Sequence, residues 1–283
     1  MPRAPTRYLP DPVDGLPARV VGSWSREKHH TLNQYLGIFA QGMRRKWSRL
    51  AYIDLFAGPG VCMDEDTLTP FPGSSLLALA QPFTDHVYVD LDPMATDALT
   101  KRVAPHRTGR NVTIITGDCN AVIDEVVAAL PSRGCLAFAF IDPSNWEIHF
   151  ETIERLVAGR KVDLLVTFHA QNMKRASTVK DQPRLDAFFG TKMWRSGTRV
   201  PTLAQVRDCY TKQMGTLGYL DRATAREIKV MKSAANQSLK YLIPFYSKND
   251  RGYDFFDKVT TEKHDGQLTW VTADATRKRR RPS

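Results

Sequence analysis

The stretch Ala51-Tyr-Ile-Asp-Leu-Phe-Ala-Gly-Pro-Gly60 decides the fold. It opens with an apolar run that is too short for a helix and is typical of a buried parallel strand, which we expect over residues 51–56. The run ends in Gly58-Pro59-Gly60, where two glycines let the backbone turn sharply and approach a ligand. Asp54 lies inside the apolar run and must find hydrogen-bond donors, because an unpaired buried charge is costly. In α/β sheets that bind nucleotides, the ligand lies at the carboxyl ends of the strands, where this turn would be.

The spacing of the glycines distinguishes two kinds of nucleotide site. The fingerprint of hydride cofactors is Gly-x-Gly-x-x-Gly, but Met63 stands at the position of the third glycine. Asp54 precedes the first glycine by four residues. An acidic residue followed by Gly-x-Gly resembles motif I of the class I S-adenosylmethionine-dependent methyltransferases. For this stretch alone, an ordinary strand followed by a turn remains the alternative.

Composition restricts the class of protein. The chain has 283 residues, of which 42% are hydrophobic and 25% charged, as in ordinary globular proteins. No apolar run approaches the ~20 residues that cross a bilayer, and the first residues lack an apolar signal region, so we expect a cytoplasmic protein. The four cysteines are far apart without a Cys-x-x-Cys pair, which predicts reduced thiols and no metal site.

The net charge of +10 favours a polyanionic partner. Part of this charge belongs to a basic run at residues 277–281, for which a solvated tail without a dedicated partner is the alternative.

Hydrophobic patterns along the rest of the chain predict alternating strands and helices. An amphipathic helix begins at Ser23 or Ser25 and carries apolar residues at three- and four-residue steps. Further strands are expected over 86–91, 111–116, 135–141, 162–168, 227–231 and 239–246, and helices over 74–80, 150–158, after Pro201 and from Gly252. This order predicts a doubly wound α/β fold with a mostly parallel, seven-stranded sheet that a C-terminal antiparallel hairpin closes.

The same patterns divide the chain into three parts. Residues 1–22 are rich in Pro and Gly and are expected to form an irregular arm. Residues 23–262 form the α/β domain, in which 169–200 is a candidate substrate loop or insertion. Residues 263–283 form a polar, basic tail.

Carboxylates stand at the ends of the next two predicted strands. Asp90 ends the strand 86–91, about 30 residues beyond the glycine turn, where a carboxylate accepts both hydroxyls of a ribose in dinucleotide folds. Asp118 follows the strand 111–116 and is placed to accept a hydrogen bond from an adenine amino group. A helix cap or turn is the alternative for both. Asp92 and Pro93 match the N-cap and first position of a helix.

The most apolar strand, 135–141, ends in Asp142-Pro143-Ser144-Asn145-Trp146. This end resembles the Asp/Asn-Pro-Pro-aromatic motif of methyltransferases that act on exocyclic amines. There the polar side chain and a proline carbonyl hold the amino group while the aromatic ring stacks on the base. Ser144 stands where the second proline belongs, and the aromatic residue comes one position late. An Asp-Pro turn into the next helix is the alternative.

Several of these segments occur in the order found in one family. They are Tyr52-Ile-Asp-Leu-Phe-Ala-Gly-Pro-Gly60, Gly73-Ser74, Asp90-x-Asp-Pro93, Gly117-Asp118-Cys119-Asn120, Phe140-Ile-Asp-Pro143 and Tyr241-Leu-Ile-x-Phe-x-Ser247. Together they resemble the three-Cys-motif partner proteins over roughly residues 23–260. The resemblance implies a methyltransferase-like fold and a separate partner protein that bears three cysteines. Ser144-Asn145 depart from the Asp-Pro-Phe-Gly that is usual in this family.

We therefore expect an S-adenosylmethionine-dependent methyltransferase whose acceptor is a nucleic acid or a nucleotide-like molecule. The candidate cofactor-binding residues are Asp54, Phe56, Gly58, Gly60, Asp90, Leu91, Asp118 and Cys119. The candidate catalytic residues, which orient the acceptor, are Asp142, Pro143 and Trp146. Trp24, Lys28 and His29 are candidates to close over the cofactor.

Three alternatives stay open. The chain could be a non-catalytic subunit that binds a cofactor or nucleotide and serves a partner enzyme, which the departures at Ser144-Asn145 favour. It could be a nicotinamide enzyme, which the missing third glycine disfavours, or a basic nucleic-acid binder without a cofactor.

Overall fold

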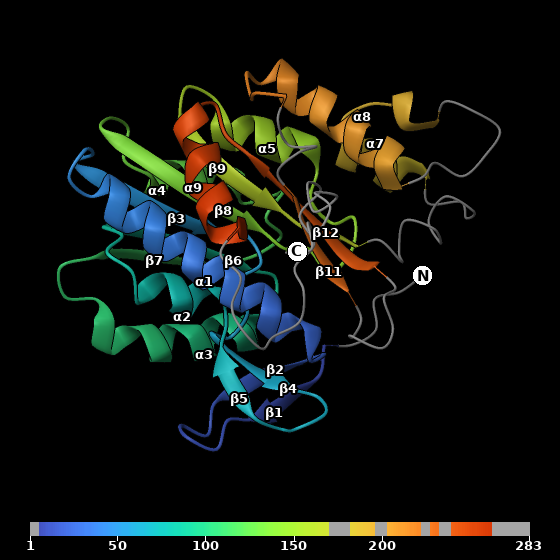
Figure 1. Ribbon diagram of the computed structural model, residues 1–283. Coiled ribbons are helices and arrows are strands. Elements are labelled where there is room, and N and C mark those ends of the chain that lie inside the picture. The colour runs from blue at the N-terminus through green and yellow to red at the C-terminus, as the bar shows by residue number, and fades with distance from the viewer. Residues whose placement is uncertain (1–5, 170–181, 196–202, 222–226, 232–238, 262–283) are drawn as a thin grey trace, which may run out of the picture.

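Eight strands form the main sheet of the computed structural model (Figure 1), which describes residues 6–169, 182–195, 203–221, 227–231 and 239–261. The strands lie in the order β10 (Phe168–His169), β12 (Leu239–Tyr246), β9 (Lys161–Val166), β8 (Cys135–Ile141), β3 (Arg49–Asp54), β6 (Asp85–Asp90) and β7 (Asn111–Thr116), and β11 (Glu227–Met231) also pairs with β12. Neighbouring strands from β9 to β7 pair in parallel, and β12 is antiparallel to β9, β10 and β11. The fold is therefore mixed α/β with a mostly parallel central sheet.

The sheet agrees with the sequence prediction in its five parallel strands but not in its strand count. It holds eight strands rather than seven, because the short strand β10 adds to β12. β11 and β12 pair antiparallel, and the residues that connect them lie outside the described part of the chain.

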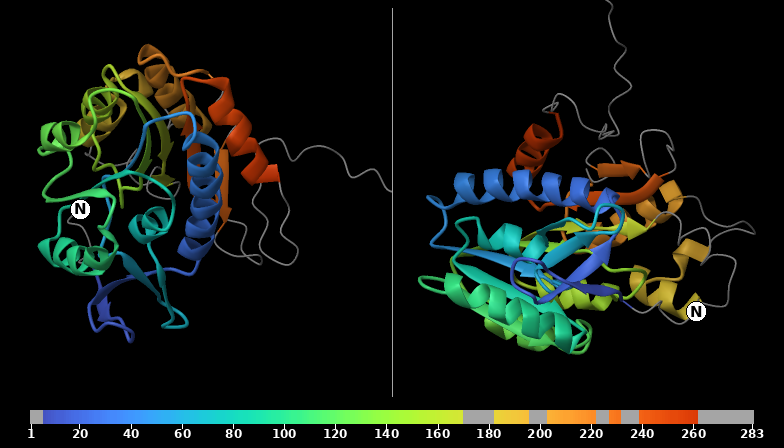
Figure 2. Two further views of the ribbon diagram at one scale, coloured as in Figure 1. Left: turned by 90° about the vertical axis from the view of Figure 1, so that its left-hand side faces the viewer. Right: turned by 90° about the horizontal axis from the view of Figure 1, so that it is seen from below.

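Helices cover the sheet on both faces, because side chains of successive strand residues point to opposite faces. One core is formed with α1 (Trp24–Met43), α2 (Ser74–Leu79), α3 (Pro93–Val103) and α9 (Asp250–Thr261). The other is formed with α4 (Ile123–Ala129), α5 (Phe150–Val157), α7 (Gln182–Phe189) and α8 (Leu203–Thr216), and the short helices are η1 (Ala104–His106) and η2 (Met193–Arg195). In the left view of Figure 2, α1 and α9 lie side by side on one side of the sheet.

The central strand β3 stands at the point where the strand order reverses. Its neighbours are β6 on one side and β8 on the other. In doubly wound sheets, the crevice at the carboxyl ends of such a pair is the usual ligand site. The glycine turn follows β3 and Asp142 follows β8, so the two features that the sequence singled out meet at this point.

The N-terminal arm is not irregular, contrary to the prediction for residues 1–22. β1 (Tyr8–Pro10) and β2 (Pro17–Val21) form a second sheet with β4 (Val61–Asp64) and β5 (Pro70–Pro72), seen in the lower part of Figure 1. β2 runs parallel to β4 with Arg19 opposite Cys62, and β1 and β5 pair antiparallel at the two edges. The acidic residues after Gly60 therefore lie at the end of β4 and in the turn that connects β4 with β5.

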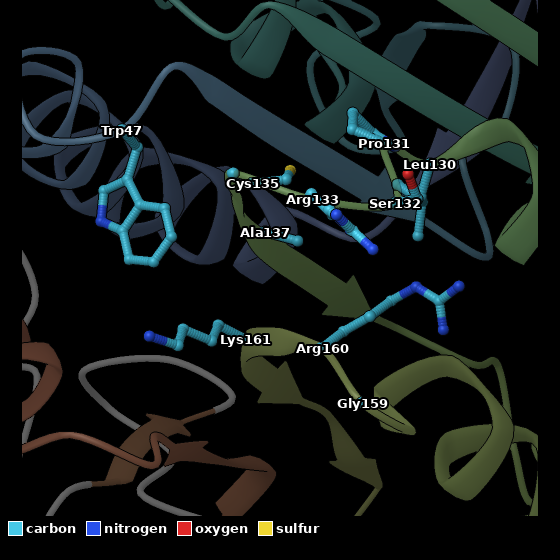
Figure 3. A pocket seen from close by; sticks show the side chains of 11 residues that line it. Trp47, Leu130, Pro131, Ser132, Arg133, Cys135, Ala137, Gly159, Arg160 and Lys161 are labelled. Carbon is cyan, nitrogen blue, oxygen red and sulfur yellow. The ribbon is translucent and has the colours of Figure 1, made fainter.

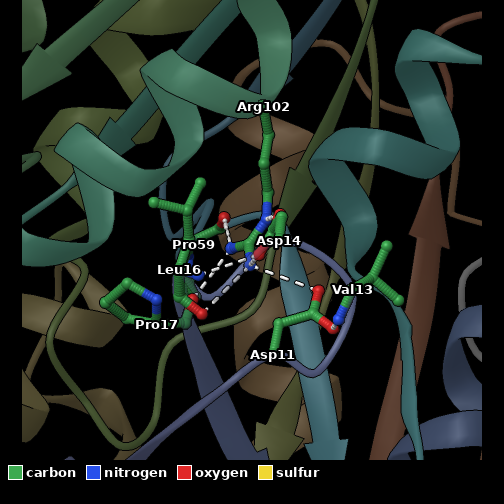
Figure 4. A network of polar contacts seen from close by, with 7 residues as sticks. All are labelled: Asp11, Val13, Asp14, Leu16, Pro17, Pro59 and Arg102. Atoms are coloured by element: carbon green, nitrogen blue, oxygen red, sulfur yellow. Dashed lines mark hydrogen bonds and ion pairs between the residues drawn. The ribbon is translucent and has the colours of Figure 1, made fainter.

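One arginine fastens this arm to the glycine turn (Figure 4). Arg102 on α3 is 5% exposed and forms an ion pair with Asp14 at 2.7 Å and a longer one with Asp11 at 3.4 Å. Its Nη1 also donates to the carbonyl oxygens of Pro17 and Pro59, at 2.8 and 2.7 Å. Pro59 is the middle residue of the turn, so Arg102 holds the arm, α3 and the turn together.

Parts of two predictions fall on residues that the structure does not describe. These are the tail 263–283 and most of the candidate loop 169–200, in which only α7, η2 and their neighbours are described. Within the described residues, no helix combines the length and hydrophobicity that a membrane span requires.

Candidate active site

The glycine turn is held open by its backbone conformation. Gly58 and Gly60 have φ values of 61° and 92°, in the region that favours glycine. The amide of Gly58 donates to the Asp90 carboxylate at 2.8 Å, and the amide of Gly73 donates to the Gly60 carbonyl at 2.7 Å. The turn is therefore fastened to β6 and to the start of α2, as a rigid edge of the site.

The two glycines differ in what a side chain would meet. A Cβ at Gly60 would lie 3.1–3.3 Å from Leu99, Arg102 and Leu76, whereas a Cβ at Gly58 would meet nothing within 4 Å. We expect Gly60→Ala to destabilise the fold by about 2–4 kcal/mol, because the free-energy cost of the strained backbone adds to that of the crowded Cβ. Gly58→Ala should cost only the backbone strain, about 1–2 kcal/mol. Urea denaturation of both variants measures this; equal losses would mean that packing at Gly60 is unimportant.

Asp54 lies beneath the turn and is fully buried. Its carboxylate accepts hydrogen bonds from the Ser74 hydroxyl at 2.6 Å, the Phe56 amide at 3.1 Å and the Tyr52 hydroxyl at 3.2 Å. Burial raises the pKa of Asp54 to about 7, although the Ser74 and Phe56 hydrogen bonds act in the opposite direction. Asp54 therefore supports the glycine turn from below and does not line the cavity described further on.

This raised pKa gives a stability prediction. In the unfolded chain Asp54 titrates near 3.8, so between about pH 4 and 7 the folded chain keeps a proton that the unfolded chain has lost. Stability therefore falls as the pH rises through this window, by up to about 4 kcal/mol at 1.36 kcal/mol per pKa unit. Between about pH 4 and 7, the free energy of unfolding of the wild type should fall by this amount relative to that of Asp54→Asn. Denaturation of both proteins at several pH values measures the difference. A difference that does not change with pH would contradict the shift.

Asp90 and Asp118 lie at the same edge of the main sheet as the glycine turn. Asp90 is the last residue of β6 and Asp118 follows β7, and these strands neighbour β3 in turn. Asp90 is half-buried and accepts hydrogen bonds from the amides of Gly58 and Asp92, at 2.8 and 3.0 Å. Asp118 is exposed and accepts from the amide and side chain of Asn120, both at 2.9 Å. Each carboxylate still has lone pairs for a ligand hydroxyl or amino group.

The residues beside these two carboxylates differ in accessibility. Leu91 is 60% exposed, so its side chain offers an apolar surface next to Asp90. Cys119 is 4% exposed and packs in the core with α4 and α5. Burial raises the pKa of its thiol to about 12, so the side chain stays neutral.

A cavity of about 230 Å³ lies between the glycine turn and the end of β8. Its lining comes from the turn, the start of α2, the end of β8, the arm, the start of α1 and Tyr241 of β12. Of the predicted site residues, it brings together Phe56, Gly58, Gly60, Asp142 and Pro143. Asp54, Asp90, Leu91, Asp118, Cys119 and Trp146 are not part of this lining. A ligand that used all the predicted cofactor residues would extend from this cavity along the edge towards Leu91.

A buried ion pair crosses the cavity. Lys28 of α1, 6% exposed, is paired with the Asp142 carboxylate, and its ammonium lies 4.9 Å from the centre of the Tyr241 ring. Burial is the largest single influence on the pKa of Lys28 and lowers it, but the charge and hydrogen bond of Asp142, together with Tyr241 and Cys62, raise the pKa above its usual value. His29 beside it stays neutral, because burial and the Lys28 charge lower its pKa to about 3. The start of α1 thus lines the cavity with Lys28 and His29, and their closing over a cofactor stays a prediction.

Trp146 lies away from the cavity. It is 5% exposed, and its ring packs edge-on against Phe188 of α7, with centroids 4.9 Å apart. The ring therefore belongs to the core on the α5 face and is not placed to stack on an acceptor in this structure.

The lining residues that sequence reasoning missed include Arg19 and Tyr241. Arg19 lies in the arm that was expected to be irregular, and only the pairing of β2 with β4 brings it to the site. Tyr241 lies in a segment quoted for its resemblance, but no spacing connects it with Lys28. The Trp24 indole, predicted to close the site, donates to the Tyr241 hydroxyl at 2.8 Å.

A second cavity, of about 250 Å³, lies at the opposite edge of the sheet, where β8 and β9 begin (Figure 3). Arg133, Arg160 and Lys161 line it together with Trp47. Arg133 follows the end of α4, and Arg160 follows the end of α5 and donates to the Ala158 carbonyl at 3.0 Å. A cation is favourable at a helix C-terminus, which suits Arg160, and the Lys161 ammonium lies 5.0 Å from the centre of the Trp47 ring.

Comparisons with known proteins concern the fold. The sequence matches no protein-family model and no curated protein. Similar solved structures include a DUF519-family protein from Legionella pneumophila, with 13% identity, a TM-score of 0.46, and 82% of this chain and 91% of that chain covered. An O-methyltransferase from Bacillus cereus in complex with SAH has 10% identity and a TM-score of 0.45, covering 77% of this chain and 81% of that one.

The O-methyltransferase TomG from Streptomyces achromogenes, in complex with SAM, has 14% identity and a TM-score of 0.45, covering 77% of this chain and 79% of that one. With TM-scores below 0.5, these similarities do not identify the activity of the chain. Only the residues of the site can indicate the activity.

Proposed function

We propose that the chain is an S-adenosylmethionine-dependent methyltransferase whose acceptor is a nucleic acid or a nucleotide-like molecule. One observation carries the proposal. The amide of Gly58 is bound to the Asp90 carboxylate at the carboxyl edge of the sheet, and a cavity leads from this turn to Asp142. The turn and the acceptor-side carboxylate line one cavity, and the hydrogen bond to Gly58 places the Asp90 carboxylate next to the turn, which supports the proposal.

The site fits this cofactor better than a dinucleotide. In dinucleotide folds the glycine turn opens a helix, whose N-terminus binds the pyrophosphate. Here the turn leads into strand β4, and Met63 pairs with Val20 and Pro70 in the small sheet. The turn therefore does not open a helix as it does in dinucleotide folds, and the start of α2 reaches the cavity only after β4 and β5.

Different residues of the chain would bind different parts of the cofactor. The space at Gly58 lets a ligand approach the backbone, and Asp90 is placed to accept ribose hydroxyls. Leu91 offers its exposed side chain and Asp118 its carboxylate to the adenine. When bound, S-adenosylmethionine supplies an electrophilic methyl group on a cationic sulfur.

The acceptor side is supplied by the end of β8 and the start of α1. Asp142 accepts a hydrogen bond from the attacking amine or hydroxyl and orients it, and the buried Lys28 fixes the position of that carboxylate. Holding the two reactants in the correct geometry supplies much of the rate in such a transfer. The net charge of +10 favours an anionic acceptor such as a nucleic acid.

Titration calorimetry with S-adenosylmethionine, S-adenosylhomocysteine and NAD tests the proposal. We expect the first two to bind and NAD not to bind. Asp90→Ala should weaken the binding of S-adenosylhomocysteine by about 1.5–3 kcal/mol, the contribution of a hydrogen bond to a charged group. Asp97→Ala, which removes an exposed carboxylate on α3, is the control. Unchanged affinity in Asp90→Ala would remove Asp90 from the cofactor site.

A second candidate function is a non-catalytic cofactor-binding subunit of another enzyme. The packing of Trp146 against Phe188 favours this second function, because no aromatic ring from the segment 142–146 lines the cavity. The resemblance to three-Cys-motif partner proteins would make a three-cysteine protein the other subunit. Methyl release from S-adenosylmethionine, with and without that protein, separates the two functions. Release by the chain alone supports the enzyme, and release that requires the partner supports the subunit.

A further inference from the structure

Arg19 has unused hydrogen-bonding capacity in the cavity. It lies in β2, is half-buried and lines the cavity opposite the start of β4. Within the described residues, its guanidinium makes one hydrogen bond, from Nη2 to the Ser144 hydroxyl at 2.9 Å. A guanidinium has five N–H donors in a planar fork that matches a carboxylate or phosphate. Four of these donors remain for a ligand.

The charge of Arg19 is not neutralised by the lining. Among the described residues that line the cavity, Asp142 is the only carboxylate, and it is paired with Lys28. The positive charge of Arg19 acts on the neighbouring Cys62 thiol. Burial raises the pKa of this thiol to about 11, and among the influences that lower the pKa the charge of Arg19 is the largest. A cavity with two cations and one carboxylate has an excess positive charge that favours an oxyanion.

Arg19 is also held in place before any ligand binds. Its strand pairs with β4 in regular register, and Arg102 binds the preceding residues Leu16 and Pro17 through their carbonyl oxygens. Cys62, opposite Arg19, comes two residues after Gly60. The backbone of Arg19 is therefore fixed beside the strand that leaves the glycine turn, and the hydrogen bond to Ser144 orients the guanidinium. Such a side chain needs little ordering on binding, which increases affinity.

We infer that Arg19 binds the carboxylate of the amino-acid end of the cofactor, so that the N-terminal arm is part of the cofactor site. This assignment rests on the proposed function. The amino-acid end is favoured over an acceptor oxyanion because Arg19 stands beside the strand that leaves the glycine turn. Its hydrogen bond to Ser144 also ties the cofactor side to the end of β8.

The experiment compares two nucleosides that differ in this end. S-adenosylhomocysteine carries the carboxylate, and 5′-methylthioadenosine has the same nucleoside thioether without the amino-acid end. Titration calorimetry on Arg19→Gln should show S-adenosylhomocysteine binding weakened roughly 10- to 100-fold, and methylthioadenosine binding changed less than about threefold. Arg19→Lys should restore part of the loss. Arg107→Gln, which removes an exposed arginine outside the cavity, should bind both like the wild type.

The other outcomes overturn the assignment in different ways. Unchanged S-adenosylhomocysteine binding in Arg19→Gln would free Arg19 for an acceptor oxyanion and refute the assignment alone. Equal weakening of both compounds, with a lowered melting temperature, would give Arg19 a purely structural role. If the wild type binds neither compound, the proposed function and this assignment fall together.

Discussion

Asp142→Asn is expected to slow methyl transfer at least about 100-fold, the lower range for a residue that handles a reacting proton. The asparagine oxygen can still accept from Lys28, so the buried lysine keeps a partner and the fold is retained. The amide cannot carry the negative charge that orients and deprotonates an amine or hydroxyl. S-adenosylhomocysteine binding should change by less than about threefold, since the contacts at Gly58 and Asp90 are unaffected.

Transfer of tritium-labelled methyl groups from S-adenosylmethionine into total RNA and into nucleoside monophosphates measures this effect. Asp97→Asn is the matched control, because its carboxylate is 64% exposed and pairs with Lys101 on the surface. Transfer by Asp142→Asn at the wild-type rate would exclude Asp142 from the reaction.

Arg102→Met is expected to lower the free energy of unfolding by about 3–5 kcal/mol, as when one partner of a buried ion pair is removed. The methionine fills part of the space of the arginine stem but leaves Asp11 buried without its cation. It also removes the donors of the Pro17 and Pro59 carbonyl oxygens. Because Pro59 lies in the glycine turn, S-adenosylhomocysteine binding should weaken together with stability.

The neighbouring residue gives the control for this variant. Lys101→Met removes a cation from the same helix, but Lys101 is 57% exposed, and surface pairs contribute about 0–1 kcal/mol. Urea denaturation should therefore separate the two variants by at least about 2 kcal/mol. Equal losses would show that the arm is not fastened by Arg102.

The main sheet was predictable because its strands are read from local patterns. Residues 111–116 and 135–141 were predicted with the bounds that β7 and β8 have, since the first is a β-branched run with polar ends and the second is an apolar run between Gly134 and Asp142. Because parallel strands all end at the same edge of a sheet, the strand order predicted that Asp54, Asp90 and Asp118 lie at one edge of the main sheet. How deep each carboxylate lies did not follow, because depth depends on covering residues such as Ser74.

The small sheet and the cavity were not predictable in the same way. β2 is five residues long, begins with Pro17 and pairs with a strand more than 40 residues later, so no local pattern marks it. Arg19 enters the site only through that pairing. The side to which Trp146 turns is set by Phe188 of α7, which is likewise distant in sequence. Motif spacing identified the segments of the site, whereas tertiary packing decided which side chains face the cavity.

A crystal structure of the chain soaked with S-adenosylhomocysteine tests the central claim most directly. We expect the ribose within hydrogen-bond distance of Asp90, the adenosyl group beside Leu91, and the amino-acid end in the cavity next to Gly58. The compound bound elsewhere, with Asp90 and the glycine turn making no contact to it, would contradict the proposed cofactor site.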